Sequence, residues 1–296
     1  MILTVSLNAT LSVGYEAERV AWGAANHLSR MTTRADGGGL AVARVLTGLG
    51  EEVVAAGFAG GGAADLIEAD LARAGVATAF TRIGRESRRL IDVLDEARGQ
   101  TTRLTEPAPF ITTEELGRFA GEYRKLLSGM DAVVLSGGLP AGLPVDIYAS
   151  LASYATEAGV PVIIHAGGPV LWHSLSRQPA LVLAASTAGA PGAGVSAEPS
   201  GLVARGAVAA AMVSGPAVLA AASQLRWRAA LNQLPGLSLS GEAVVAGLLP
   251  AVAQGWTWPD ALRHAVALGA AADPAGEVDL DGYELLSSEV SVEPAG

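Results

Sequence analysis

The feature that most constrains the fold of this chain is a repeated alternation of short apolar runs with longer segments of helical spacing. Apolar runs of about four to six residues have the length of buried strands, and such alternation is typical of a parallel sheet covered by helices. The sequence therefore predicts an α/β fold with a mainly parallel sheet. The predicted strands are 2–6, 53–57, 132–136, 162–165 and 181–183. The predicted helices are 39–49, 64–74, 113–127, 145–158, 242–254 and 258–272.

Two segments interrupt this alternation. Residues 12–34 and 82–105 each contain β-like runs with charged residues and no long helix within the segment. We therefore expect a small second sheet that stands off the main one. The chain has 296 residues, of which 50% are hydrophobic and 5% are aromatic. This length and composition suit a single large α/β domain over 1–296 with a core of small aliphatic side chains.

The charge balance excludes several classes of protein. The formal net charge is −10, which repels nucleic acids and anionic membrane surfaces. The chain has no cysteine, which rules out disulfides and thiolate metal sites. Residues 1–8 lack the basic and apolar regions of a signal peptide. We therefore expect a cytoplasmic protein without a nucleic-acid or membrane partner.

The longest uncharged apolar stretch is 206–222. A membrane-spanning helix needs about 20 strongly apolar residues. This stretch is shorter, is dominated by alanine, and is interrupted by Gly215 and Pro216. We therefore expect a buried helix–strand pair here instead of a membrane segment.

A set of short motifs occurs in one order along nearly the whole chain. They are MILTVSLN at 1–8, ADGGGLAVAR at 35–44, GFAGG at 57–61, TEP at 105–107, SGGLPAG at 136–142, LSGEA at 239–243, WPDAL at 258–262 and GEVD at 276–279. Each motif alone has low specificity, but the ordered set resembles the PfkB (ribokinase-like) family of carbohydrate kinases, in particular its 1-phosphofructokinases and tagatose-6-phosphate kinases. The resemblance implies a three-layer αβα core and a small β-sheet lid, formed here by the segments 12–34 and 82–105.

The resemblance also implies a chemistry. In such kinases an Asp at a helix N-terminus takes the proton of the acceptor hydroxyl, and ATP with Mg²⁺ supplies the phosphoryl group. Glycines before that Asp let backbone N–H groups approach the phosphoryl, where the helix dipole favours negative charge. The sugar phosphate binds between core and lid. We therefore expect ATP and Mg²⁺ as cofactors if the chain is active, and otherwise none.

The position of the catalytic base is Glu242 in this chain, one methylene longer than the Asp of the family. A misplacement of about 1 Å costs on the order of a hundredfold in rate. Two interpretations therefore stay open: a degenerate base, or a first-turn Glu stabilised by the helix dipole. Ser240 and Gly241 stand at the anion-hole positions, and Leu239 replaces the first glycine of the motif.

On the acceptor side, most ligand residues of the family are replaced. The replacements are Ser12 for an Asp, His27 for an Arg, Gly38 for a Lys, and Ala41 and Leu90 for Asn residues. Gly37 belongs to the same glycine loop, where Asp36 adds negative charge in place of a glycine. Arg88, with Arg89 beside it, is either a remaining phosphate-binding residue or part of a solvated lid face.

On the nucleotide side, three further positions differ from the family. His165 ends a predicted strand in place of the Asp of an Asp-Thr-Ser-Gly segment, and Leu183 and Ala185 replace the Lys and Asn of a Lys-Pro-Asn segment. The loop at 213–217 lacks the spaced glycines that hold a nucleotide. A histidine at a strand end suits a general base or a metal ligand. No second ligand lies at metal-binding spacing, which favours a buried, hydrogen-bonded histidine and predicts no metal site.

Three hypotheses follow from this distribution of changes. The first, which we favour, is a pseudokinase with a binding or regulatory role, since the core pattern is intact while positions for chemistry are replaced. The second is a divergent kinase, with Glu242 as base and Arg88 holding a sugar phosphate. The third is an enzyme of another class that uses His165 and Glu242 as an acid–base pair. The resemblance also implies a homodimer formed through the lid.

Overall fold

The computed structural model describes residues 1–185, 198–231 and 236–295. Within these residues, a large ten-stranded sheet has the order β14-β13-β12-β11-β10-β9-β8-β1-β4-β5. Its strands from β5 to β11 pair in parallel, and β11 to β14 pair antiparallel. The strands are β1 (Ile2–Ser6), β4 (Val53–Gly60), β5 (Ala77–Ile83), β8 (Ala132–Ser136), β9 (Val162–Ala166), β10 (Leu181–Ala184), β11 (Ala209–Ser214), β12 (Ala217–Ala222), β13 (Leu225–Ala230) and β14 (Ser291–Pro294).

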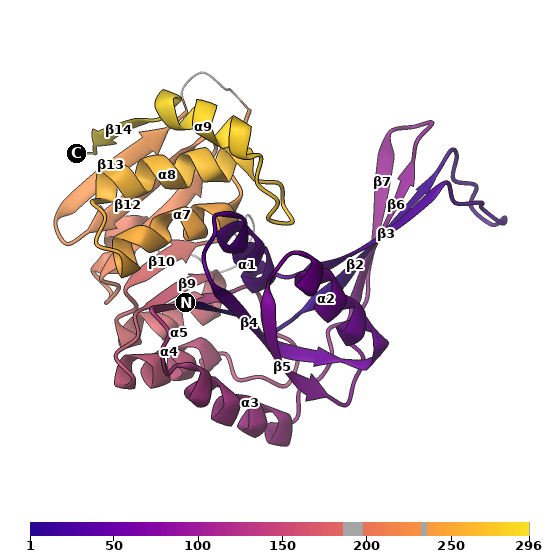
Figure 1. Cartoon of the computed structure of the whole chain (residues 1–296), viewed down its shortest axis with the longest axis horizontal. Helices are drawn as coiled ribbons and strands as arrows, with labels where there is room; N and C mark the ends of the chain where they lie inside the picture. Colours follow the sequence, from indigo (N-terminus) through magenta and orange to yellow (C-terminus); the bar gives the residue numbers. More distant parts are fainter. Residues whose placement is uncertain (186–197, 232–235, 296) are drawn as a thin grey trace.

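Helices cover both faces of this sheet and complete three layers (Figure 1). One apolar cluster packs α1, α2, α7 and α8 against the sheet, and a second cluster packs α3, α4 and α5 against the other face. The helices are α1 (Gly38–Gly48), α2 (Gly61–Arg73), α3 (Thr113–Leu126), α4 (Ile147–Glu157), α5 (Gly168–Ser174), α6 (Pro199–Val203), α7 (Gly241–Ala253), α8 (Trp258–Ala271) and α9 (Leu280–Glu289), with a 3₁₀ turn at Leu175–Arg177. The α/β class and the mainly parallel sheet predicted from the sequence are confirmed.

Local signals explain where several helices begin. Thr112 and Glu115 form a reciprocal capping box at the start of α3, which satisfies backbone N–H groups that the first turn leaves unpaired. The side chain of Ser240 caps α7, and that of Thr257 caps α8. The predicted starts of these three helices therefore lie within one residue of the observed starts.

A small four-stranded sheet stands away from the large one (Figure 1). Its order is β3-β2-β6-β7, with strands β2 (Thr10–Ala17), β3 (Arg30–Asp36), β6 (Arg89–Asp95) and β7 (Gln100–Thr105). The second of the two irregular segments thus enters this sheet at Arg89, because Ala77–Ile83 pairs with β4 at the edge of the large sheet. The base of the small sheet is anchored in the main core through Leu11 and Val13.

The alanine-rich stretch 206–222 is a β-hairpin, so the expected helix–strand pair is wrong. β11 and β12 pair antiparallel across the turn at Gly215 and Pro216. Gly215 has a positive φ of 57°, which glycine adopts readily. Pairing with β10 and β13 on either side overrides the helical propensity of alanine. Among the described residues, the structure contains no helix of the length and apolarity needed to cross a membrane.

Candidate functional site

The candidate site lies where parallel strands of the large sheet end and two helices begin. Ser6 ends β1, Ser136 ends β8, and His165 lies next to the end of β9. Ser136 and His165 are register partners, and Ser136 Oγ lies 3.1 Å from His165 Nδ1. In open α/β sheets the carboxyl ends of strands are where ligands bind. The strand ends therefore position a buried serine–histidine hydrogen bond at that edge.

Glycines allow the N-termini of α1 and α7 to pack closely against the side chains of Ser6, Ser136 and His165. A Cβ at Gly37 would lie 2.6 Å from Ser6 Oγ, and one at Gly38 would lie 2.5 Å from Ser136 Oγ. A Cβ at Gly241 would lie 3.1 Å from His165 Nε2. The structure therefore brings together four predicted site residues, at positions 37, 38, 165 and 241.

Glu242 adjoins this cluster from the first turn of α7. Its Oε1 lies 3.8 Å from His165 Nδ1, which is too long for a hydrogen bond. Ser136 already occupies that nitrogen, so the imidazole is oriented by Ser136, while Glu242 acts on it only through its charge. The neighbouring Ser240, at the N-cap of α7, accepts a hydrogen bond from the backbone N–H of Ala243.

Burial determines the charge of the histidine. Desolvation lowers the pKa of His165 below its usual value, and the nearby Glu242 carboxylate offsets part of that effect. The neutral imidazole is therefore favoured at pH 7. With His165 neutral, Glu242 has no cationic neighbour among the described residues that line its cavity.

A cavity of about 350 Å³ opens beside Glu242, and we call it the α7 pocket. It is lined by His165, Leu183, Ala184, Ala185, Val213, Gly215, Ser238, Leu239, Gly241 and Glu242. Leu239 is also buried in the core, at 5% exposure, so it forms part of the pocket wall instead of projecting freely. No Arg or Lys lines this pocket among the described residues, and the flanking stretches 186–197 and 232–235 contain no charged residue in the sequence.

The C-terminal part of the chain is acidic as a whole. Residues 185–296 contain four Arg, no Lys and ten acidic residues, a formal net charge of −6. Mg²⁺-nucleotides are held by acidic ligands to the metal and by cationic or backbone donors to the phosphates. Within the described ranges, no group of three or more Asp, Glu or His side chains could hold a metal ion. The described side chains around the α7 pocket therefore offer Mg²⁺-ATP one carboxylate and no cationic group.

A second pocket, of about 640 Å³, lies beside the small sheet, and we call it the Arg88 pocket. It is lined by Arg85, Glu86, Ser87, Arg88, Glu106, Pro107, Ala108, Pro109 and Phe110. Arg88 Nε donates to Thr10 Oγ1 at 3.0 Å, and Arg88 forms no ion pair within the described part of the chain. Arg89, by contrast, pairs with Glu86 and Glu106. Arg88 is therefore the arginine of this pair whose charge is available to an anion.

The other predicted acceptor residues are spread over the small sheet and α1. Ser12 pairs in register with Arg34 and Leu90 near the base of the sheet. His27 lies at the opposite end, in the exposed connection between β2 and β3, so it is not brought together with Ser12. Ala41 is buried in α1.

Two features of the site were missed by sequence reasoning. The motif at 136–142 gives Ser136 no role of its own, yet Ser136 orients His165; its position at a strand end was the available signal. Arg34 forms ion pairs with Asp273 and Glu277, at 3.2 and 2.6 Å. These pairs link the small sheet to the segment after α8, and nothing in the local sequence indicated them.

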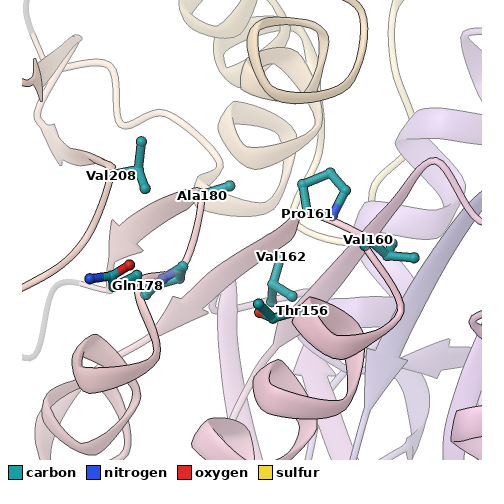
Figure 2. Close-up of a pocket in the computed structure, with 9 residues that line it drawn as sticks. Thr156, Val160, Pro161, Val162, Gln178, Ala180 and Val208 are labelled. Atoms are coloured by element: carbon teal, nitrogen blue, oxygen red, sulfur yellow. The ribbon is translucent and has the colours of Figure 1, made fainter.

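A third cavity, of about 320 Å³, lies at the opposite edge of the sheet (Figure 2). It is formed around the amino ends of β9 and β10, between Pro161, Gln178 and Val208. None of its lining residues is charged or shared with the α7 pocket. It therefore takes no part in the site at the carboxyl ends of the strands.

Comparisons with known proteins place this geometry in a family. Residues 11–184 match the model of the pfkB family of carbohydrate kinases. A tagatose-6-phosphate kinase from Staphylococcus epidermidis is 36% identical over 171 residues, which are 58% of this chain and 54% of that protein. The matched region thus spans about half the length of this curated relative.

Solved structures share the fold over the whole chain. A putative phosphofructokinase from Staphylococcus aureus has a TM-score of 0.84 at 22% identity, covering 100% of this chain and 99% of the other. A possible 1-phosphofructokinase from Thermotoga maritima has a TM-score of 0.84 at 23% identity, with full coverage of both chains. Because the family model covers more than half of the sequence and the fold agrees throughout, this chain belongs to the pfkB family of carbohydrate kinases.

Proposed function

We propose that this pfkB-family chain is a pseudokinase with a binding or regulatory role. The observation that carries the proposal is the α7 pocket, which lies on the nucleotide side and has no Arg or Lys among its described lining residues. His165, neutral and bonded to Ser136, stands where the family resemblance places an Asp. A polyphosphate that enters such a pocket meets the carboxylate of Glu242 without compensating positive charge.

A divergent kinase is the second candidate, and two observations favour it. Glu242 lies in the first turn of α7 directly after Gly241, which is where the resemblance places the base and the anion hole. Arg88 lines a separate pocket without an acidic partner in the described residues, so it is suited to hold a sugar phosphate. In this reading Mg²⁺-ATP binds mainly through backbone groups, because the side chains present do not fit it.

An enzyme of another class is the third candidate. This candidate requires His165 and Glu242 to lie close together beside a cavity. They lie 3.8 Å apart and both line the α7 pocket. The hydrogen bond of Ser136 to His165 Nδ1 opposes direct proton exchange between the pair, so this candidate remains behind the other two.

The small sheet supports two further parts of the proposal. We infer that it acts as a lid on a single ribokinase-like domain and that it joins two copies of the chain. One face of the sheet carries Tyr15, Met31 and Val93, which are register partners, and Leu104 on the same face is half exposed. An apolar strip of this kind is suited to burial in a homodimer. Sedimentation analysis of the parent and of Met31→Glu tests this: the dimer is expected for the parent alone.

The experiment that tests the proposed function is release of ADP from Mg²⁺-ATP, measured with a panel of sugar phosphates that includes fructose 1-phosphate and tagatose 6-phosphate. A pseudokinase gives no turnover above the Glu242→Gln variant. Turnover that disappears in that variant would instead establish the divergent kinase. Turnover that persists in it would point to a contaminating kinase, which a second purification removes.

A further inference from the structure

Glu242 presents a carboxylate to the α7 pocket, and no Lys or Arg of the described residues pairs with it. Among the described residues, its one ionisable neighbour at short range is His165, whose pKa is lowered by burial. No hydrogen bond or ion pair from Lys or Arg reaches Glu242 within the described part of the chain. Its side chain is 29% exposed, so the carboxylate is partly desolvated yet accessible from the cavity.

Aliphatic side chains form one part of the remaining pocket wall. Leu183, Val213 and Leu239 contribute apolar walls, together with Ala184 and Ala185. The described lining residues include no Phe, Tyr or Trp, so they offer an aromatic ligand no ring to stack on. The volume of about 350 Å³ lies near the lower end for small-molecule sites. A site with one carboxylate and aliphatic walls suits a small molecule with a cationic head and an apolar body.

We propose that the α7 pocket binds a small aliphatic ammonium compound, with the ammonium on the Glu242 carboxylate and the hydrocarbon against Leu183, Val213 and Leu239. The proposal rests on the proposed function, because it assigns the pocket a ligand other than a nucleotide. An ammonium supplies the charge-assisted hydrogen bonds that the carboxylate lacks. A carboxylate or phosphate of the same size is rejected by like charge, and a neutral alcohol gains only a weaker hydrogen bond.

The test is calorimetric titration of the full chain at neutral pH with 1-hexylammonium, compared with 1-hexanol and hexanoate. We expect 1-hexylammonium to bind at least about tenfold more tightly than 1-hexanol, and hexanoate not to bind, because a charge-assisted hydrogen bond is about twice as strong as a neutral one. Glu242→Gln should reduce 1-hexylammonium affinity about tenfold or more. Glu242→Asp, which keeps the charge, should retain measurable binding.

Asp260→Asn is the matched control. Asp260 is also a first-turn carboxylate, in α8, and it does not line the pocket, so its variant should bind 1-hexylammonium like the parent. Equal affinity for 1-hexylammonium in Glu242→Gln and the parent would overturn the proposal, as would equal binding of hexanoate. Measuring ADP release separates the ligand assignment from the proposed function. If the parent shows neither turnover nor 1-hexylammonium binding, only the ligand assignment is wrong. If the parent shows turnover, the pseudokinase proposal is wrong.

Discussion

The Arg88 pocket and the α7 pocket differ in the charge that they offer to a ligand. The first is lined by Arg85 and Arg88 as well as by two acidic residues, and the second by Glu242 with no basic side chain in the described residues. The match to the pfkB family model also ends at residue 184, before most of the α7 pocket. The two pockets therefore differ in the basic side chains that they offer to an anion, although the fold is shared with the pfkB-family structures on both sides of the molecule.

The regions around the Arg88 pocket and the α7 pocket also differ in the interactions that stabilise them. Near the small sheet, Asp70 accepts from the backbone N–H of Ala35 at 2.7 Å and pairs with the buried Arg44. Around α7 the contacts are apolar and close: a Cβ at Gly247 would lie 2.4 Å from the Cα of Ala265 in α8. The first side therefore depends on a buried ion pair, and the second on tight helix packing.

The largest effect that we expect comes from breaking this ion pair. Asp70→Ala leaves Arg44 charged and buried, at 8% exposure, and should lower the free energy of unfolding by about 3–5 kcal/mol. Urea denaturation measures the change. Asp65→Ala, an exposed carboxylate on the same helix α2, is the control and should change stability by less than about 1 kcal/mol. Equal losses in the two variants would remove this contrast between the two sides.

The next effect concerns anion binding in the Arg88 pocket. If Arg88 holds the phosphate of a sugar phosphate, Arg88→Ala should weaken binding of fructose 1-phosphate by about 1.5–3 kcal/mol, or roughly tenfold to a hundredfold. Calorimetric titration measures this. Arg118→Ala, on the exposed surface of α3, should bind like the parent. Unchanged affinity in Arg88→Ala would make this arginine part of a solvated face and erase the difference between the pockets.

A smaller effect is expected from restoring the family residue in the glycine loop. Gly38→Lys places a Cβ 2.5 Å from Ser136 Oγ and 3.1 Å from the backbone nitrogen of Gly137. We expect a loss of about 1–3 kcal/mol in unfolding free energy, typical of overpacking, and no gain of ADP release. Gly121→Lys, in open space on α3, should not destabilise. A Gly38→Lys protein as stable as the parent would show that this loop tolerates a lysine side chain.

The smallest effect that we expect is a pH dependence of the free energy of unfolding, caused by two buried histidines. Burial lowers the pKa of His165 and of His264. The unfolded chain therefore binds more protons below its ordinary histidine pKa of about 6.5, and the free energy of unfolding should fall as the pH drops below that value. Denaturation between about pH 5 and 8 measures this slope. His165→Asn should make the slope shallower, and an unchanged slope would contradict the assigned burial of the neutral imidazole.

Much of the fold could be predicted from the sequence because its signals are local. The strands at Ile2–Ser6 and Ala132–Ser136 were predicted with their observed ends, since each is a short, mainly apolar run that ends at a serine. The hairpin of β11 and β12 was not predicted, because alanine carries no strand signal and the pairing depends on neighbours distant in sequence.

The site was only partly predictable for the same physical reason. The glycine loop at Gly37 and Gly38 and the start of α7 at Gly241 were recognised from motifs. The hydrogen bond between Ser136 and His165, which lie 29 residues apart in the sequence, follows from the register of β8 and β9. No local sequence pattern specifies that register. The sequence also could not predict that the described lining of the α7 pocket contains no Arg or Lys, because the fold determines which residues line the pocket.

The most direct test of the central claim is calorimetric titration of the full chain with Mg²⁺-ATP. We predict no saturable binding at millimolar nucleotide, in the parent or in Glu242→Gln, because the α7 pocket offers a carboxylate and no described cationic side chain to the phosphates. Saturable binding of Mg²⁺-ATP would contradict the account, and would show that backbone groups around Gly241 are sufficient to hold the nucleotide.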